Sequence, residues 1–164
     1  VADADLTLPP DLFKRYAGVG ADIDPDRPYL VVLQHPVTTE YGQGFAQISE
    51  TLNAISAIGM QVAWLWPNVD AGSDDVSKGL RVFREHTNPD YLHFYRNFSP
   101  EDYLRLIKHC ACLVGNSSSG LREGVFMGVP CVNIGTRQQG RERGVNVIDV
   151  PYDAEKIGAA IRRQ

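Results

Sequence analysis

Short, continuous apolar runs alternate along the chain with longer segments in which apolar residues recur every three or four positions. The apolar runs predict six buried strands, at residues 29–34, 61–66, 91–95, 112–114, 131–134 and 146–150. The periodic segments predict helices at residues 44–58, 74–85, 100–109 and 120–127, and from residue 153 to the end. Repeated strand–helix units of this length predict an α/β fold: a doubly wound parallel sheet, Rossmann-like, in the strand order 3-2-1-4-5-6.

Local signals mark the boundaries of some of these helices. Ser99 precedes Pro100 and stands three residues before an acid, a pattern typical of a helix N-terminus. Gly59 follows the segment 44–58 and is expected to end that helix. These signals agree with the boundaries that the periodicity predicts.

Unusual polar residues follow the ends of the predicted strands. In the expected strand order, ligands bind in the crevice beyond the carboxyl ends of the first and fourth strands. His35 follows the first of these strands, and residues 115–119 follow the fourth. Asn68 and Arg137 come after the second and fifth strands. We therefore expect all of these residues at one edge of the sheet.

Residues 115–120 (GNSSSG), the serine loop, join the fourth strand directly to a predicted helix. Small residues leave the backbone unobstructed, and the free N–H groups of a helix start hold phosphate well. Glu123 lies six residues after Ser117 and could bind ribose hydroxyls, so the segment indicates a nucleotide. An ordinary strand–loop–helix corner with a Ser N-cap explains the same pattern, and the segment alone leaves both interpretations open.

The other candidates also have two interpretations. His35 could donate to a diphosphate or stabilise a leaving group, although a histidine at a strand end is more often structural. Asn68 could contact a ligand or serve as a turn residue. Arg137, Arg141 and Arg143 share a glycine-rich loop that could close over phosphates or simply be solvated.

Composition limits the function classes. A chain of 164 residues that is 43% hydrophobic fits one domain, residues 1–164, with a real core. A net charge of −4 without a basic tract argues against a nucleic-acid surface. No apolar run approaches membrane-spanning length and no signal-peptide pattern is present, so we expect no membrane association and a cytoplasmic location.

Familiar catalytic motifs are absent from the sequence. It contains no nucleophile elbow, no GxxxxGK[ST] loop, no GxGxxG after the first strand and no metal-ligand cluster, so we expect neither a metal nor a cofactor. Cys110, Cys112 and Cys131 lie in or beside apolar runs and are expected to be buried free thiols. The domain looks equipped to hold a nucleotide rather than to perform chemistry alone.

Four ordered motifs resemble those of UDP-N-acetylglucosamine 2-epimerases of the hydrolysing branch, which release N-acetylmannosamine and UDP for sialic-acid-type sugars. They are residues 34–40 (QHPVTTE), 67–73 (PNVDAGS), 115–123 (GNSSSGLRE) and 133–142 (NIGTRQQGRE). The resemblance covers nearly the whole chain but only the C-terminal half of the family. It implies one half of a GT-B fold, with residues 1–28 as an interdomain linker or lead-in segment and the N-terminal catalytic half absent.

The resemblance also implies residue roles. His35 would be the catalytic residue, beside the diphosphate and the sugar. UDP would be bound by Asn68, Ser117, Ser118, Glu123 and Arg137. Position alone places Phe98 near the uracil. Relatives often have GEN where this chain has Gly144-Val145-Asn146, so a role for that acid does not carry over.

The implied reaction is elimination of UDP from UDP-N-acetylglucosamine to give a 2-acetamidoglucal, followed by hydration. The acids that move protons belong mainly to the other half, so the isolated domain is expected to be inactive. The implied partners are UDP, UDP-N-acetylglucosamine, the missing N-terminal domain and a second copy of the full-length protein. A non-hydrolysing epimerase, the donor domain of a GT-B glycosyltransferase and a non-catalytic nucleotide-binding module remain as alternatives.

Overall fold

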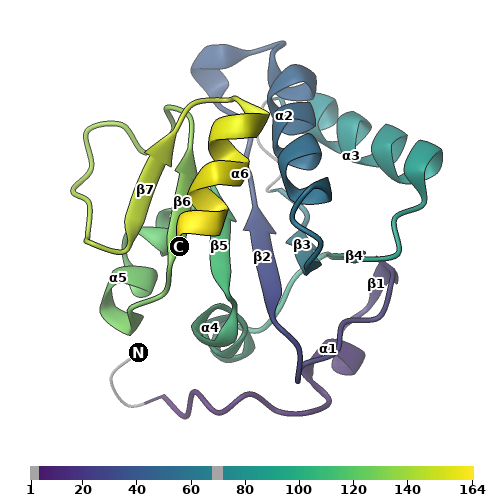
Figure 1. The fold of residues 1–164 in the computed structure, drawn as a ribbon, viewed down its shortest axis with the longest axis vertical. Helices are drawn as coiled ribbons and strands as arrows, with labels where there is room; N and C mark the ends of the chain where they lie inside the picture. Colours follow the sequence, from purple (N-terminus) through teal and green to yellow (C-terminus); the bar gives the residue numbers. More distant parts are fainter. Residues whose placement is uncertain (1–3, 68–71) are drawn as a thin grey trace.

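The fold is built on one seven-stranded sheet (Figure 1). A computed structural model of the chain describes residues 4–67 and 72–164. The strands are β1 (Gly18–Gly20), β2 (Tyr29–Leu33), β3 (Gln61–Leu65), β4 (Leu92–Tyr95), β5 (Cys112–Gly115), β6 (Cys131–Ile134) and β7 (Val147–Val150). Their order is β1-β4-β3-β2-β5-β6-β7, and only the β1–β4 pair is antiparallel. The predicted order of the six parallel strands is confirmed.

The edge strand β1 was not among the predicted strands. It consists of only Gly-Val-Gly and is exposed along its length, so it carries no apolar alternation that a sequence pattern could reveal.

Helices cover both faces of the sheet. They are α1 (Leu12–Arg15), α2 (Gly44–Ser56), α3 (Ser73–Thr87), α4 (Pro100–His109), α5 (Glu123–Met127) and α6 (Ala154–Arg163), with 3-10 turns η1 (Thr38–Glu40) and η2 (Ser118–Gly120). Helices α2, α3 and α6 pack on one face, and α1, α4 and α5 pack on the other (Figure 1). Along β2, Leu30 and Val32 enter the first core while Tyr29 and Val31 enter the second, as expected of a strand buried on both faces.

The Ser99 capping signal is confirmed, whereas α2 ends at Ser56, three residues before Gly59. The Ser99 side chain accepts a hydrogen bond from the amide of Asp102 at 3.2 Å, with Pro100 in the first turn of α4. Asp153 caps α6 in the same way, accepting from the amide of Lys156 at 3.0 Å. These bonds satisfy amides that the helix itself leaves unpaired, which fixes where each helix begins.

The predicted helix at residues 120–127 was wrong in its first part. The chain makes the turn η2 immediately after Ser117, and α5 begins only at Glu123. Arg122 interrupts the helix with a non-helical backbone (φ −109°, ψ −82°). Gly120 also packs so closely on Cys131 that a Cβ there would lie 2.4 Å from its sulfur, so this turn needs a residue without a side chain. The serine loop therefore opens into a 3-10 turn rather than into a long helix.

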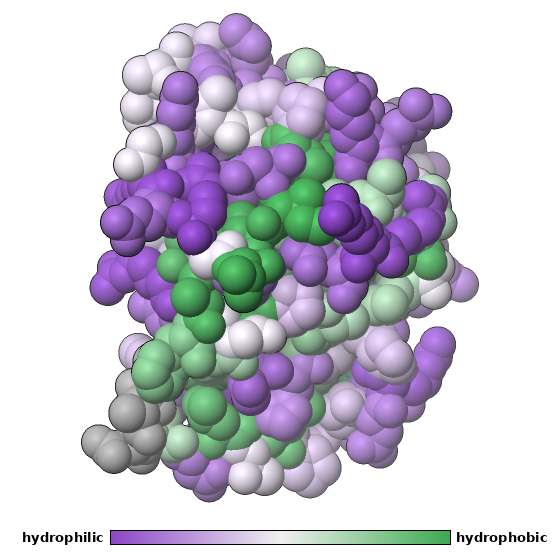
Figure 2. All heavy atoms as spheres, turned by 60° about the vertical axis from the view of Figure 1, so that its left-hand side comes forward, coloured by the Kyte–Doolittle hydropathy of each residue, from purple (hydrophilic) through white to green (hydrophobic). Residues whose placement is uncertain are grey.

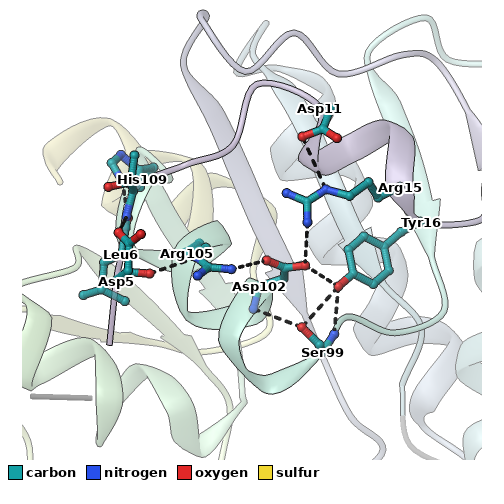
Figure 3. A network of polar contacts seen from close by, with 10 residues as sticks. Asp5, Leu6, Asp11, Arg15, Tyr16, Ser99, Asp102, Arg105 and His109 are labelled. Carbon is teal, nitrogen blue, oxygen red and sulfur yellow. Dashed lines mark hydrogen bonds and ion pairs between the residues drawn. The ribbon is translucent and has the colours of Figure 1, made fainter. Parts of the chain in front are cut away.

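The lead-in segment is packed rather than loose. Leu12 and Phe13 of α1 are buried in the second core. Farther toward the N-terminus, the side chains of Arg105 and His109 on α4 bond the carbonyl oxygens of Asp5 and Leu6 at 2.8 and 2.7 Å (Figure 3). Residues 4–28 are thus held against α4 and the sheet.

A buried carboxylate joins this segment to α4, in what we call the lead-in network: Arg15, Tyr16, Ser99, Asp102 and Arg105 (Figure 3). Asp102 accepts from the Tyr16 hydroxyl at 2.5 Å and from Arg105 at 2.7 Å, and Arg15 lies 3.5 Å away. The bond from Tyr16 is the largest cause that holds the pKa of Asp102 below its usual 3.8; burial opposes it, and both arginines add to it.

All three cysteines are buried and unpaired, as predicted. Burial raises the pKa of Cys112 and of Cys131 to about 12, which keeps both thiols protonated. Within the described residues, no helix has the length and apolar character needed to cross a bilayer.

Figure 2 brings the side of the molecule that carries α5 and β7 forward, and apolar atoms there lie exposed among polar ones. The exposed apolar residues of this region include Val125 and Phe126 of α5 and Val145 before β7. Helix α5 therefore buries Met127 in the core while leaving part of its outer face apolar.

Candidate functional site

The carboxyl ends of β2 and β5 lie side by side at the centre of the sheet, where Leu33 pairs with Gly115. Gly115 has φ +133°, and a Cβ there would lie 2.0 Å from the carbonyl oxygen of Leu33. Only glycine suits this backbone and this close approach. Gly115 therefore sets the spacing between the His35 loop and the serine loop, which are neighbours as predicted.

Asn116 ties these two loops together. Its side-chain oxygen accepts from the His35 amide at 2.7 Å, and its side-chain nitrogen donates to the His35 carbonyl at 2.8 Å. Its own carbonyl accepts from Arg137 Nη1 at 3.1 Å and from Gln138 Nε2 at 2.8 Å. We call His35, Asn116, Arg137 and Gln138 the rim network; it joins the loops that follow β2, β5 and β6.

The serine loop is ordered by a chain of hydroxyl groups. Ser117 Oγ lies 2.8 Å from Ser119 Oγ, and Ser119 Oγ lies 2.6 Å from the hydroxyl of Tyr103 on α4. The amide of Ser119 also donates to Ser117 Oγ at 3.3 Å. Among the described residues, the amides of Ser117 and Ser118 donate no hydrogen bond, so two adjacent N–H groups remain for a ligand.

Glu123 begins α5 close to these hydroxyls. Gly124, the next residue of α5, packs on the serine loop, since a Cβ there would lie 3.2 Å from the Ser119 carbonyl oxygen. Burial raises the pKa of Tyr103 to about 12, and the charge of Glu123 adds to this rise. The structure therefore brings Glu123, Ser117, Ser118, His35 and Arg137 to one rim of the sheet. How each of them acts on a ligand stays a prediction.

Three other expectations have different outcomes. Asn68 lies outside the described residues. The Phe98 ring is buried against Tyr16 and Tyr95, at 4.4 and 5.0 Å between ring centroids, and its expected place near the uracil stays a prediction. Arg143 binds Asp149 at 3.0 Å and the carbonyl of Gln138 at 2.9 Å, so it fastens the glycine-rich loop.

Sequence reasoning missed Glu40, whose carboxylate connects η1 with α2 and with the loops that follow β6 and β7. Its carboxylate accepts hydrogen bonds from Thr136, from Gln47 at 2.6 Å and from the Tyr152 hydroxyl at 3.0 Å. Burial raises the pKa of Glu40, but these three bonds together lower it below the usual 4.5. Glu40 lies within a motif that was recognised, but nothing local indicates partners 96 and 112 residues away.

Asn116 and Tyr103 were also missed as site residues. Asn116 stands inside the serine loop, where its amide could have been singled out. Tyr103 carries no such signal, because its position within a helix looks like ordinary core packing. Among the described residues, no cluster of three or more His, Cys, Asp or Glu side chains could hold a metal ion.

Comparison with known sequences gives a consistent result. The sequence profile described as UDP-N-acetylglucosamine 2-epimerase matches residues 3–164. The polysialic acid biosynthesis protein P7 of Escherichia coli is 40% identical over 131 residues, which is 79% of this chain and 33% of that protein. A UDP-N-acetylglucosamine 2-epimerase of Neisseria meningitidis serogroup B is 31% identical over 161 residues, 98% of this chain and 40% of that protein.

The name of a further relative specifies a reaction. The UDP-N,N'-diacetylbacillosamine 2-epimerase (hydrolyzing) of Legionella pneumophila is 31% identical over 150 residues, 90% of this chain and 38% of that protein. The chain thus spans between a third and two fifths of the length of these relatives.

Solved structures agree on the fold. The UDP-GlcNAc 2-epimerase of Methanocaldococcus jannaschii has a TM-score of 0.66 at 16% identity, covering 87% of this chain and 39% of that one. The MnaA–UDP structure of Staphylococcus aureus has a TM-score of 0.61 at 10% identity, covering 84% and 36%. The predicted class, a Rossmann-like half of a GT-B fold, is confirmed. Since the family profile covers nearly all of its residues, this chain belongs to the UDP-N-acetylglucosamine 2-epimerase family.

Proposed function

We propose that this chain is the UDP-binding half of a hydrolysing UDP-N-acetylglucosamine 2-epimerase, which converts its substrate and water to N-acetylmannosamine and UDP. The observation that carries the proposal is the bridge through Asn116, which holds His35 and Arg137 beside the serine loop at the central crevice. The name of the Legionella relative supports the hydrolysing branch, and that of the E. coli relative supports a role in sialic-acid-type sugars.

The diphosphate would lie over the serine loop. The amides of Ser117 and Ser118 and the Ser117 hydroxyl are donors, as phosphate oxygens require. Arg137 donates to the carbonyl of Asn116 in the same loop and supplies positive charge. Amides and a guanidinium that converge in this way suit a phosphate group.

Glu123 would bind the ribose. A carboxylate accepts hydrogen bonds from two neighbouring hydroxyls, and the first turn of α5 holds Glu123 next to the serines that take the phosphate. Asn68 is proposed to line the same UDP site, on the strength of its motif alone.

His35 would act on the leaving group. In the elimination, the bond between sugar C1 and the diphosphate oxygen breaks while C2 loses its hydrogen as a proton, giving UDP and a 2-acetamidoglucal. Water then adds across the double bond to give N-acetylmannosamine. His35 would stabilise the negative charge that collects on the departing diphosphate. The groups that move protons at C2 would come from the rest of the longer protein, so this chain alone should bind UDP without turnover.

Calorimetric titration of the chain with UDP tests the binding. Glu123→Ala should weaken UDP binding by about 2–3 kcal/mol, the effect of losing a charged hydrogen-bonding partner. Glu155→Ala is the matched control, because Glu155 also stands in the first turn of a short helix, α6, away from the serine loop. Equal affinities of the two variants would remove Glu123 from the site.

The products formed by the longer protein separate the remaining functions. Free N-acetylmannosamine and UDP are expected, whereas UDP-N-acetylmannosamine would indicate a non-hydrolysing epimerase. Sugar moved to an acceptor would indicate a glycosyltransferase, and turnover of UDP-N-acetylglucosamine by this chain alone would contradict the division of labour proposed above.

A further inference from the structure

We infer that Tyr103 is a positioning residue that orients the Ser117 hydroxyl toward the phosphate of the nucleotide. The inference rests on the proposed function, because it concerns the same site. Tyr103 lies on α4, outside the serine loop.

Three hydroxyl groups form a continuous chain from α4 to the rim. The Tyr103 hydroxyl lies 2.6 Å from Ser119 Oγ, and Ser119 Oγ lies 2.8 Å from Ser117 Oγ. Ser119 is buried, whereas Ser117 is partly exposed at the outer end of the chain. Tyr103 at the inner end packs partly buried against the second core, and Ser117 at the outer end belongs to the loop beside the rim network.

The direction of donation along this chain decides what Ser117 can offer. Each hydroxyl has one proton to donate, while a phosphate oxygen at neutral pH only accepts. Either oxygen of each pair can donate by its geometry, and our inference assigns the protons so that Tyr103 donates to Ser119 and Ser119 donates to Ser117. Ser117 Oγ then accepts from Ser119 through both the hydroxyl and the amide, which leaves the Ser117 proton for the ligand.

Without the tyrosine hydroxyl, this polarity is lost. Ser119 Oγ would have no donor on its inner side, and Ser117 could direct its proton inward to Ser119 instead of outward. Burial raises the pKa of Tyr103 to about 12, which keeps its hydroxyl protonated at neutral pH and able to donate. The tyrosine acts through the two serines and does not need to touch the nucleotide.

The test compares Tyr103→Phe with Tyr29→Phe. Tyr29 is a matched control, since its buried hydroxyl also bonds at α4, donating to the Leu106 carbonyl at 2.8 Å, far from the serine loop. In titrations with UDP, Tyr103→Phe should raise the Kd about tenfold, the effect of one lost hydrogen bond, while Tyr29→Phe leaves it unchanged. Ser119→Ala removes the oxygen toward which Ser117 could turn its proton inward, so it should raise the Kd less than Tyr103→Phe does, and it provides a second variant in case Tyr103→Phe misfolds.

A double variant distinguishes positioning from general loosening. If Tyr103 acts through the Ser117 hydroxyl, adding Tyr103→Phe to Ser117→Ala should change the Kd no further. If the double variant instead raises the Kd by the product of the two single effects, the inference is overturned. It is also overturned if Tyr103→Phe leaves UDP binding intact. Failure of the unchanged chain to bind UDP would instead overturn the proposed function and, with it, this inference.

Discussion

The rim network and the lead-in network have the same arrangement but differ in the charge of their central side chain. Each is centred on one buried side chain that joins segments far apart in sequence, Asn116 in the first and Asp102 in the second. Asn116 is neutral and makes amide hydrogen bonds, whereas Asp102 is a carboxylate held by a tyrosine and two arginines.

The difference has a physical reason. A carboxylate at the centre of the rim would repel the phosphate proposed to bind there, so a neutral amide is the suitable organiser. The lead-in network lies where no anion is expected, and it can use charge to hold α4 to the N-terminal segment. The predictions below disturb each centre in turn, starting with the largest expected effect.

Gly115→Ala should break the rim most severely. The new Cβ would meet the Leu33 carbonyl at 2.0 Å in a backbone conformation that suits glycine, so we expect a loss of at least about 4 kcal/mol in unfolding free energy. Urea unfolding measures it. Gly140→Ala is the control: Gly140 also has a positive φ (+79°) but open space around it, and the substitution should cost only about 1 kcal/mol. Equal losses of unfolding free energy in the two variants would mean that a Cβ at Gly115 fits beside the Leu33 carbonyl.

Asn116→Asp places a carboxylate at the centre of the rim network, as Asp102 does in the lead-in network. The aspartate could still accept from the His35 amide but could no longer donate to the His35 carbonyl, which would face a buried negative charge. We expect a loss of about 3 kcal/mol in unfolding free energy, together with weaker UDP binding. A variant as stable as the original chain would show that the neutral centre is not required.

Asp102→Asn replaces the carboxylate at the centre of the lead-in network by a neutral amide, the reverse of Asn116→Asp. The amide can still accept from Tyr16, but the attraction to the partly exposed arginines is lost, so the expected loss in unfolding free energy is only about 1 kcal/mol. UDP affinity should stay unchanged. A loss as large as that of Asn116→Asp would contradict the contrast between the two networks.

The pH dependence of unfolding provides a check on the prediction for Asp102→Asn. Because the pKa of Asp102 is lower in the folded protein than its usual 3.8, its stabilising contribution is complete above that value and disappears as the pH falls through the folded pKa. The stability difference between the original chain and Asp102→Asn should therefore shrink as acid is added. A difference as large at about pH 3 as at about pH 7 would show that the pKa is not lowered.

Local patterns predicted the parallel sheet and the start of α4 because their causes are local. Apolar runs gave the strands, and the Ser99 cap acts only three residues away. The rim could be predicted in outline, because parallel strands bring their carboxyl ends together. The pairing of His35 with Asn116 spans 81 residues, and that of Tyr16 with Asp102 spans 86, distances at which pattern carries no information about side-chain partners. The contact of Phe98 with Tyr16 was not predicted for the same reason, since Tyr16 lies in the lead-in segment.

The burial of Cys110, Cys112 and Cys131 has a practical consequence for following this domain in solution. All three native thiols are shielded from alkylating reagents, so a cysteine introduced at an exposed position would react alone. Gln139, exposed in the loop that follows β6, is such a position. A fluorophore attached there would report, without removal of any native cysteine, how that loop responds when a nucleotide arrives.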